Sequence, residues 1–255
     1  MNDSGRYPGN YAANTYWRQY KFRLVIIDGM RASLVVAAAA LVGVTCTTSA
    51  AWADADVDRA LAAARVKAAA GDVVAQFSLG SMLYYGAEDT EQAIAWFRRA
   101  AAQQYAPAEF QMGQLYDFGF GVTQEDDEAL KWYRKAAGHG HAAGQGAVGD
   151  FLQKGRGVPA DPAEAARWYR RAADGDDIRA QYQLGQMDFS GSGVPLDYAS
   201  AYLWFSLAAG QAPLVDNRTA LLELRNIAAV RMTPEQVADA ARRVSAWTPV
   251  AADHR

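Results

Sequence analysis

The side chains best suited to metal or proton chemistry are three histidines, and two of them, His139 and His141, are separated by a single glycine. Two imidazoles supply half of a tetrahedral zinc site, and no third ligand stands nearby in the sequence. The remaining histidine, His254, lies next to the last residue. We therefore interpret His139 and His141 as residues of a surface turn, and the sequence predicts no metal site.

Motifs that activate a nucleophile are absent from the sequence. There is no Ser-x-x-Lys of the penicillin-type acylating enzymes, no Gly-x-Ser-x-Gly elbow and no His-Glu-x-x-His zinc motif. Acid pairs such as Asp126-Asp127 and Asp176-Asp177 stand at turns and expected helix starts, where carboxylates interact favourably with the helix dipole. The sequence therefore predicts no catalytic residue and no cofactor.

The strongest pattern in the chain is structural. Trp96, Trp132, Trp168 and Trp204 follow one another at intervals of 36 residues. Each Trp precedes a second aromatic residue, and alanines stand three residues before it and four residues after it. This spacing predicts a helix with one apolar face, and a period of this length is typical of a repeat array. We expect each Trp and its aromatic neighbour to fill the gap between layers of helices.

A second helix is predicted upstream of each Trp. It carries an apolar residue followed by glycine, at Leu79-Gly80, Met112-Gly113, Val148-Gly149 and Leu184-Gly185. Glycine inside a helix costs about 1 kcal/mol relative to alanine, so its recurrence indicates close contact between helices. In three repeats a Gly-x-Gly-Val turn joins the two helices, and its first glycine suits a left-handed helix end. The first repeat lacks this turn and has a shorter connection.

These elements together resemble the Sel1-like repeat family, which is related to tetratricopeptide repeats. The matching segments are Ala-x-x-x-Leu-Gly, Gly-x-Gly-Val and Ala-x-x-Trp-Tyr-x-x-Ala-Ala, and the segment 232–236 (Met-Thr-Pro-Glu-Gln) resembles the usual ending of the family. Gly144 and Asp188 depart from the pattern. The resemblance implies an all-α, right-handed solenoid of about four helix-turn-helix repeats closed by helical caps.

The sequence predicts an export signal in the N-terminal region. Residues 34–44 are apolar and uninterrupted, but a transmembrane helix needs about 20 residues. Arg31 precedes this run and Ala51-Trp52-Ala53 follows it, which predicts a secretory signal peptide cleaved after Ala53. We expect a periplasmic or secreted protein, and the alternative is an inner-membrane anchor through residues 34–53. The only cysteine, Cys46, would be removed with the signal, so the mature chain would have no disulfide.

The sequence therefore divides into five parts. Translation from Met30 would make the residues before it non-native, and the alternative is that they extend the signal's n-region. The expected parts are 1–29 (non-native or extended n-region), 30–53 (signal peptide), 54–74 (N-terminal capping helix), 75–211 (four repeats) and 212–255 (C-terminal capping helices and tail).

The charge pattern argues against nucleic acid as a partner. The chain has 25 basic and 28 acidic residues and a net charge of −3, so it lacks the excess of basic residues typical of nucleic-acid binding. Basic pairs recur after the tryptophans, at Arg98-Arg99, Arg134-Lys135 and Arg170-Arg171. We interpret them as a solvated outer face rather than an anion-binding stripe.

The candidate binding residues follow each apolar-Gly pair. By analogy with tetratricopeptide arrays, the first helix of each repeat lines the concave face, and the exposed positions there form a mixed polar and aromatic set suited to an extended peptide. They are Ser81, Tyr84, Tyr85, Gln114, Asp117, Asp150, Gln153, Lys154, Gln186 and Phe189.

We therefore expect a monomeric, non-catalytic adaptor of the bacterial periplasm that binds a protein or peptide partner. We expect no contact with nucleic acid and, once the signal peptide is removed, no membrane attachment. The resemblance leaves open a cell-envelope enzyme that binds or hydrolyses β-lactams, as suggested for some secreted relatives. A membrane-anchored structural scaffold is the other alternative.

The leader predicts a mature N-terminus at Asp54, because Ala51 and Ala53 supply the small residues of a signal-peptidase site. N-terminal sequencing of the exported protein measures this directly. Finding Met1 or Met30 at the N-terminus of the exported protein would contradict cleavage.

Overall fold

The computed structural model describes residues 48–86, 89–212 and 214–249, and these residues form helices joined by turns, with no β-strand among them. The chain divides into two compact units, residues 1–62 and residues 63–255. The second unit contains the repeats. Residues 34–44 of the expected signal peptide lie outside the described residues. The expected cleavage position, Ala53, lies in helix α2 (Thr48–Ala69).

Four helical hairpins of similar size follow α2, and two helices complete the chain. The hairpins are α3 (Val73–Tyr85) with α4 (Thr90–Ala102), α5 (Ala106–Phe118) with α6 (Asp126–Gly138), α7 (Ala142–Lys154) with α8 (Pro162–Asp174), and α9 (Ile178–Ser190) with α10 (Tyr198–Gln211). The last two helices are α11 (Val215–Ala229) and α12 (Pro234–Ser245). None of the described helices is long and apolar enough to cross a bilayer.

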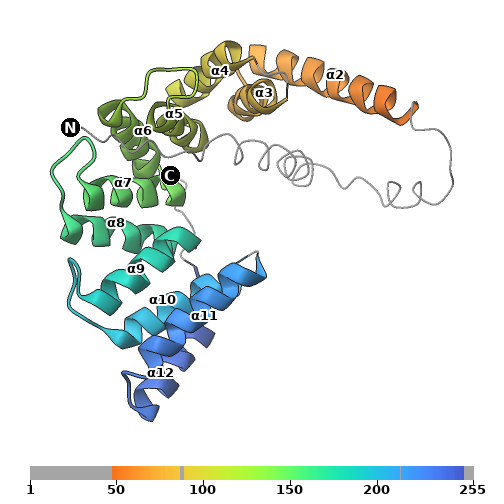
Figure 1. Ribbon diagram of the computed structural model, residues 1–255. Coiled ribbons are helices and arrows are strands. Elements are labelled where there is room, and N and C mark those ends of the chain that lie inside the picture. Colours follow the sequence, from red (N-terminus) through yellow and green to blue (C-terminus); the bar gives the residue numbers. More distant parts are fainter. Residues whose placement is uncertain (1–47, 87–88, 213, 250–255) are drawn as a thin grey trace, which may run out of the picture. The chain divides into compact units, whose positions relative to one another are not determined.

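The hairpins stack in sequence order (Figure 1). The two helices of each hairpin pack against each other, and α4, α6 and α8 each pack against the first helix of the next hairpin. Helix α10 packs against both α11 and α12, which together cover the last hairpin. The all-α repeat solenoid expected from the sequence is thus confirmed, and the first hairpin forms despite its shorter turn.

Helix ends follow the capping residues that the sequence supplies. Asp161 accepts a hydrogen bond from the backbone N–H of Glu164 at 2.8 Å, and Pro162 occupies the first position of α8. Thr233 and Gln236 form the expected reciprocal capping box at the start of α12. The glycines after α5, α7 and α9 all adopt left-handed backbone angles, for example φ 68° at Gly155, where a side chain would be strained.

The recurring helical glycine marks the closest contact inside each hairpin. The aromatic residue after each Trp lies flat against this glycine. A Cβ atom at Gly113 would stand 2.5 Å from a ring carbon of Tyr133, and one at Gly185 would stand 2.5 Å from a ring carbon of Phe205. The same clash would occur in the other two hairpins. Only glycine therefore lets the two helices of a hairpin approach with an aromatic ring between them.

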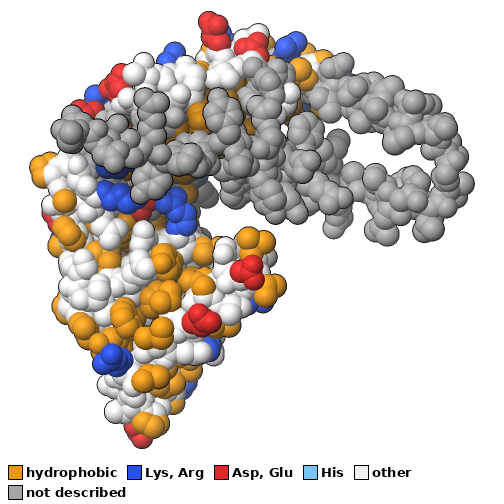
Figure 2. All heavy atoms as spheres, viewed as in Figure 1, with side chains coloured by type: hydrophobic (Ala, Val, Ile, Leu, Met, Phe, Trp, Pro, Cys, Tyr) orange, Lys and Arg blue, Asp and Glu red, His pale blue; other side chains and the backbone are white. Residues whose placement is uncertain are grey.

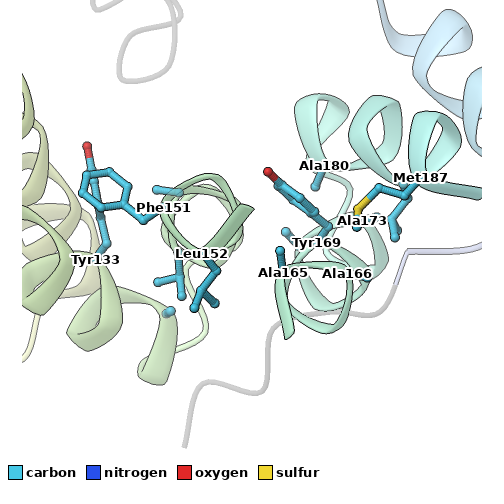
Figure 3. Packing of buried hydrophobic residues seen from close by; sticks show 14 of the residues in the cluster. Tyr133, Phe151, Leu152, Ala165, Ala166, Tyr169, Ala173, Ala180 and Met187 are labelled. Carbon is cyan, nitrogen blue, oxygen red and sulfur yellow. The ribbon is translucent and has the colours of Figure 1, made fainter. Parts of the chain in front are cut away.

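The tryptophans themselves are less buried than the sequence predicted. Trp204 is 1% exposed, but Trp96, Trp132 and Trp168 are only half-buried. Their aromatic neighbours are the deep residues: Tyr169, for example, is 1% exposed and packs among α8 and α9 side chains (Figure 3). Successive residues of a helix differ by about 100° in direction. The residue after each Trp therefore faces the partner helix, and the Trp lies at the edge of the outward face.

This difference in burial predicts a difference in stability. Tyr169→Ala should lower the free energy of unfolding by about 3–5 kcal/mol, because it empties a fully buried site. Trp168→Ala should cost about half as much, because its ring is partly solvated already. Urea unfolding of the two variants measures both changes, with Tyr169→Phe as the control for the hydroxyl alone. A larger loss from Trp168→Ala than from Tyr169→Ala would contradict this packing.

Candidate functional site

The ten predicted binding residues lie on the first helices of the four hairpins, and we call the surface that they form the A-helix face. Ser81, Tyr84 and Tyr85 belong to α3, Gln114 and Asp117 to α5, Asp150, Gln153 and Lys154 to α7, and Gln186 and Phe189 to α9. Each stands one, four or five residues after the helical glycine. These offsets place them on one side of each helix.

Side-chain contacts between hairpins show that successive first helices are neighbours. Tyr85 of α3 hydrogen-bonds to Gln111 of α5. Further along, the ring of Phe110 stacks on His141 with centroids 4.7 Å apart. Asp150 of α7 and Arg179 of α9 form an ion pair with a distance of 2.5 Å between the charged atoms. The A-helix face is therefore continuous across the four hairpins.

Two buried tyrosines support the middle of this face from below. The Tyr133 hydroxyl donates to Asp117 Oδ2 at 3.0 Å, and the Tyr169 hydroxyl donates to Asp150 Oδ1 at 2.7 Å. Gln153 Oε1 lies 2.9 Å from the same Tyr169 hydroxyl. Both hydroxyl groups point to the same side in Figure 3. These bonds hold Asp150 and Gln153 in half-buried positions. Asp117 is only 9% exposed, so the expectation that it is an exposed binding position is wrong, because its carboxylate turns inward to the Tyr133 hydroxyl and Arg156.

The two tyrosines remain hydrogen-bond donors at physiological pH. Burial, followed by the charge of the nearby aspartate, raises the pKa of both Tyr133 and Tyr169. Asp117 also pairs with Arg156 at 2.7 Å, and Arg156 reaches Asp126 from its position in the turn after α7. Figure 2 shows basic side chains gathered near α7. The centre of the face thus holds two clusters of carboxylate, hydroxyl and guanidinium groups, one around Tyr133 and one around Tyr169.

Other predicted residues keep polar groups free for a partner. Gln114 and Lys154 have no hydrogen bond or ion pair to other described residues. Gln186 is exposed and donates one amide hydrogen to the Tyr182 hydroxyl, which leaves its amide oxygen unpaired. Phe189 packs edge-on against Tyr198. These side chains can bind the backbone or side chains of an extended peptide.

The two tyrosines at the start of the face differ in exposure. Tyr84 is half-buried against Phe97, and burial raises its pKa to about 12. Tyr85 is 38% exposed and lies edge-on to Tyr84 with ring centroids 4.8 Å apart. Ser81 donates its hydroxyl hydrogen to the carbonyl of Phe77 in its own helix. Tyr85 is therefore the more accessible of the two rings.

Sequence reasoning missed an exposed aromatic pair beside Gln114. Phe118 is 57% exposed and Phe120 is 47% exposed, and their ring centroids are 5.7 Å apart. Phe118 stands five residues after Gly113, which is the offset of Tyr85 and Lys154 in their own hairpins. Applying that offset to every repeat would have found it. The face therefore has an aromatic section at the first two hairpins.

The two neighbouring histidines bind separate partners in the turn between α6 and α7. His139 Nδ1 lies 2.7 Å from the buried Glu109 carboxylate. His141 accepts a hydrogen bond from the backbone N–H of Gly144, and burial lowers its pKa. Among the described residues no group of three or more His, Cys, Asp or Glu side chains could hold a metal ion.

Asp188 of α9 has the most strongly perturbed carboxyl group among the described residues. It is 4% exposed, and its Oδ2 atom has no hydrogen-bond partner. Burial raises its pKa to about 6, with Arg170 and Arg243 opposing the shift and Asp197 adding to it. Asp188 occupies the position where the repeat pattern has tyrosine, so a carboxylate replaces a group that stays neutral.

Comparison with known protein families identifies the four hairpins as repeats of one family. The Sel1 repeat model matches residues 73–105, 106–141, 142–177 and 178–212, which coincide with the four hairpins. No curated protein matches the chain.

Two solved structures are similar over most of the chain. One is a Sel1 repeat protein from Oxalobacter formigenes, with 31% identity and a TM-score of 0.64, covering 74% of this chain and 79% of that one. The other is a protective antigen of uropathogenic Escherichia coli strains, with 34% identity and a TM-score of 0.62 over 72% of this chain. The match spans only 39% of that antigen's length.

Asp188 predicts a pH dependence of stability. Its pKa is raised above the ordinary value of 3.8, so its contribution is fully present below about pH 4 and is lost as the pH rises through about 6. Lowering the pH from about 8 to about 5 should therefore raise the free energy of unfolding by about 1 kcal/mol. Asp188→Asn should remove this step and be more stable than wild type near pH 8. Identical pH profiles of wild type and Asp188→Asn in urea unfolding would contradict the assignment.

Proposed function

Because the chain belongs to the Sel1 repeat family, whose repeats are generally protein-interaction modules, we propose that it is a non-catalytic adaptor that binds a protein or peptide through the A-helix face. Family membership by itself does not identify a partner. The proposal rests on the arrangement of side chains on the four first helices.

The observation that carries the proposal concerns the side chains of the A-helix face. Buried residues hold some of these side chains in place, and others have polar groups with no partner among the described residues. Buried tyrosine hydroxyls hold Asp117, Asp150 and Gln153, while the polar groups of Gln114 and Lys154 have no partner among the residues that the structure describes. A surface that is already ordered loses little conformational entropy on binding. A primary amide group both donates and accepts hydrogen bonds, so it can pair with the C=O and N–H groups of an extended peptide backbone.

The proposed site has two chemically different sections. The first two hairpins present Tyr85, Phe118 and Phe120, and the last two present mainly Lys154 and Gln186. Aromatic side chains are common anchors of binding energy at interfaces. A peptide that lies along the face would place apolar residues against the first section and polar residues against the second.

We further propose that this adaptor works in the periplasm or outside the cell. The support is the sequence of the leader, with Arg31, the apolar run 34–44 and Ala51-x-Ala53. After cleavage the chain would start in α2, and the hairpins that carry the A-helix face would all be retained.

The test uses peptides selected from a random display library on the wild-type chain, with binding measured by titration. The variant Gln114→Ala/Lys154→Ala/Gln186→Ala should weaken the selected peptides by at least about tenfold, because each truncation of a central contact costs about 1 kcal/mol or more. Its melting temperature should stay close to that of wild type, because exposed substitutions usually change stability by less than about 0.5 kcal/mol.

The matched control is Arg98→Ala/Arg134→Ala/Arg171→Ala on the second helices, where exposed polar side chains are also truncated. This control should bind the selected peptides with unchanged affinity. Failure to select any peptide, or equal affinity for wild type and the A-helix-face variant, would overturn the proposal.

A further inference from the structure

The second helices carry a separate band of positive charge, which we call the outer stripe. It consists of exposed basic residues on α4, α6 and α8, repeated at 36-residue intervals. They are Arg98, Arg99, Lys131, Arg134, Lys135, Arg167, Arg170 and Arg171. On α6 and α8 the three basic residues stand at positions i, i+3 and i+4, so they share one face of the helix. That face is turned away from the first helix of the hairpin, because the buried residues of α6 and α8 lie on the other side.

Most of these charges are not neutralised by carboxylates. Among the described residues, Lys131 is the only member of the stripe in an ion pair, with Glu128 at 2.5 Å. Arg170 interacts by charge with two carboxyl groups, those of Asp174 and Asp188, without forming an ion pair with either.

The other acidic residues of these helices stand in their first turns. Asp127 and Glu125 act on Lys131 by charge. Glu164, three residues before Arg167, accepts a hydrogen bond from the Trp168 indole. A cationic band therefore exists on a chain whose net charge is −3.

Tryptophan rings hold the charges in place and join one helix to the next. The cationic groups of Arg99, Lys135 and Arg171 lie 4.3, 4.0 and 4.8 Å from the ring centroids of the Trp residues three positions earlier. Arg170 of α8 crosses to the next hairpin and lies 5.0 Å from the Trp204 ring of α10. Such cation–π contacts fix the cations without neutralising them. The stripe is thus a layer of alternating indole rings and cations over consecutive helices.

The stripe presents its cations on exposed ridges rather than in a pocket. Among the described residues, a cavity of about 560 Å³ touches it only at Arg134, and the remaining lining comes from Leu152, Gly193 and residues 158–164. A nucleotide would need a pocket to make directed contacts. Anionic lipid headgroups form a dense two-dimensional layer and need only exposed cations, and indole rings are favoured at the bilayer interface.

We propose that the outer stripe binds the surface of an anionic phospholipid bilayer. The sequence alone predicted a solvated outer face and no membrane attachment after cleavage. This proposal departs from that interpretation because the structure stacks the cations on tryptophan rings and places only Lys131 of the stripe in an ion pair among the described residues. The contact is peripheral, through charge and half-buried tryptophans, and inserts no helix. It therefore differs from the membrane anchoring that the leader's apolar run would provide. The stripe lies on the second helices and the A-helix face on the first, so the protein could contact a bilayer and a partner at the same time. This proposal does not depend on the peptide-binding proposal.

The test is cosedimentation of the full chain with vesicles at low salt. The vesicles contain phosphatidylcholine alone, or phosphatidylcholine and phosphatidylglycerol in equal parts. We expect binding to the phosphatidylglycerol vesicles to be much the stronger, and to fall at high salt because the charges are exposed. The variant Arg98→Gln/Arg134→Gln/Arg167→Gln removes three cations that make no cation–π contact with a ring of the described residues. Each surface cation is worth about fivefold in partition, so the variant should bind about a hundredfold more weakly.

The matched control is Arg65→Gln/Lys67→Gln/Arg231→Gln, which makes the same change in net charge on α2 and on the turn after α11. All variants carry the same N-terminal residues, so any effect of the leader cancels between them. The control should bind phosphatidylglycerol vesicles like wild type. Equal binding to the two kinds of vesicle, or equal loss in the stripe variant and the control, would overturn the proposal. Vesicle binding too weak to detect, with tight binding to poly-glutamate instead, would overturn it in favour of an acidic protein partner.

Discussion

The contact between a helical glycine and an aromatic ring is the constraint on which the rest of this structure depends. In each hairpin the ring after the Trp lies against the glycine of the first helix, so close that a Cβ atom there would overlap it. The ring fills the interior, and the alanines around it allow the next helix to pack closely. The contact recurs in every hairpin, so the four repeats of the array all pack their two helices in the same way.

The same contact determines the chemistry of the A-helix face. In the two middle hairpins the ring is a tyrosine, and its hydroxyl passes beside the first helix to reach Asp117 or Asp150. In the outer hairpins the ring is phenylalanine, Phe97 or Phe205, which offers no hydroxyl. The two charged clusters are therefore confined to the middle of the face. A difference of one oxygen atom in the core thus becomes a difference in polarity at the surface.

The A-helix face and the outer stripe lie on different helices of the hairpins. The first helix contributes amide, hydroxyl and aromatic side chains, and the second contributes cations stacked on indole rings. On α6 and α8 the acidic residues of the second helix stand mainly in the first turn and basic residues in the last turn, which also suits the helix dipole. One repeat sequence can therefore carry two independent surfaces without conflict in the core.

The sequence by itself determined the period, the helices, their caps and the family, because these follow from local spacing and from residues such as Asp161, Thr233 and the turn glycines. The tertiary structure decided which aromatic residue is buried, since the direction of a side chain matters only relative to a neighbouring helix. It placed Tyr169 in the core and Trp168 at its edge. It also decided which predicted binding residues are held by buried hydroxyls, because Asp150 and Tyr169 are 19 residues apart and meet only when the hairpin closes.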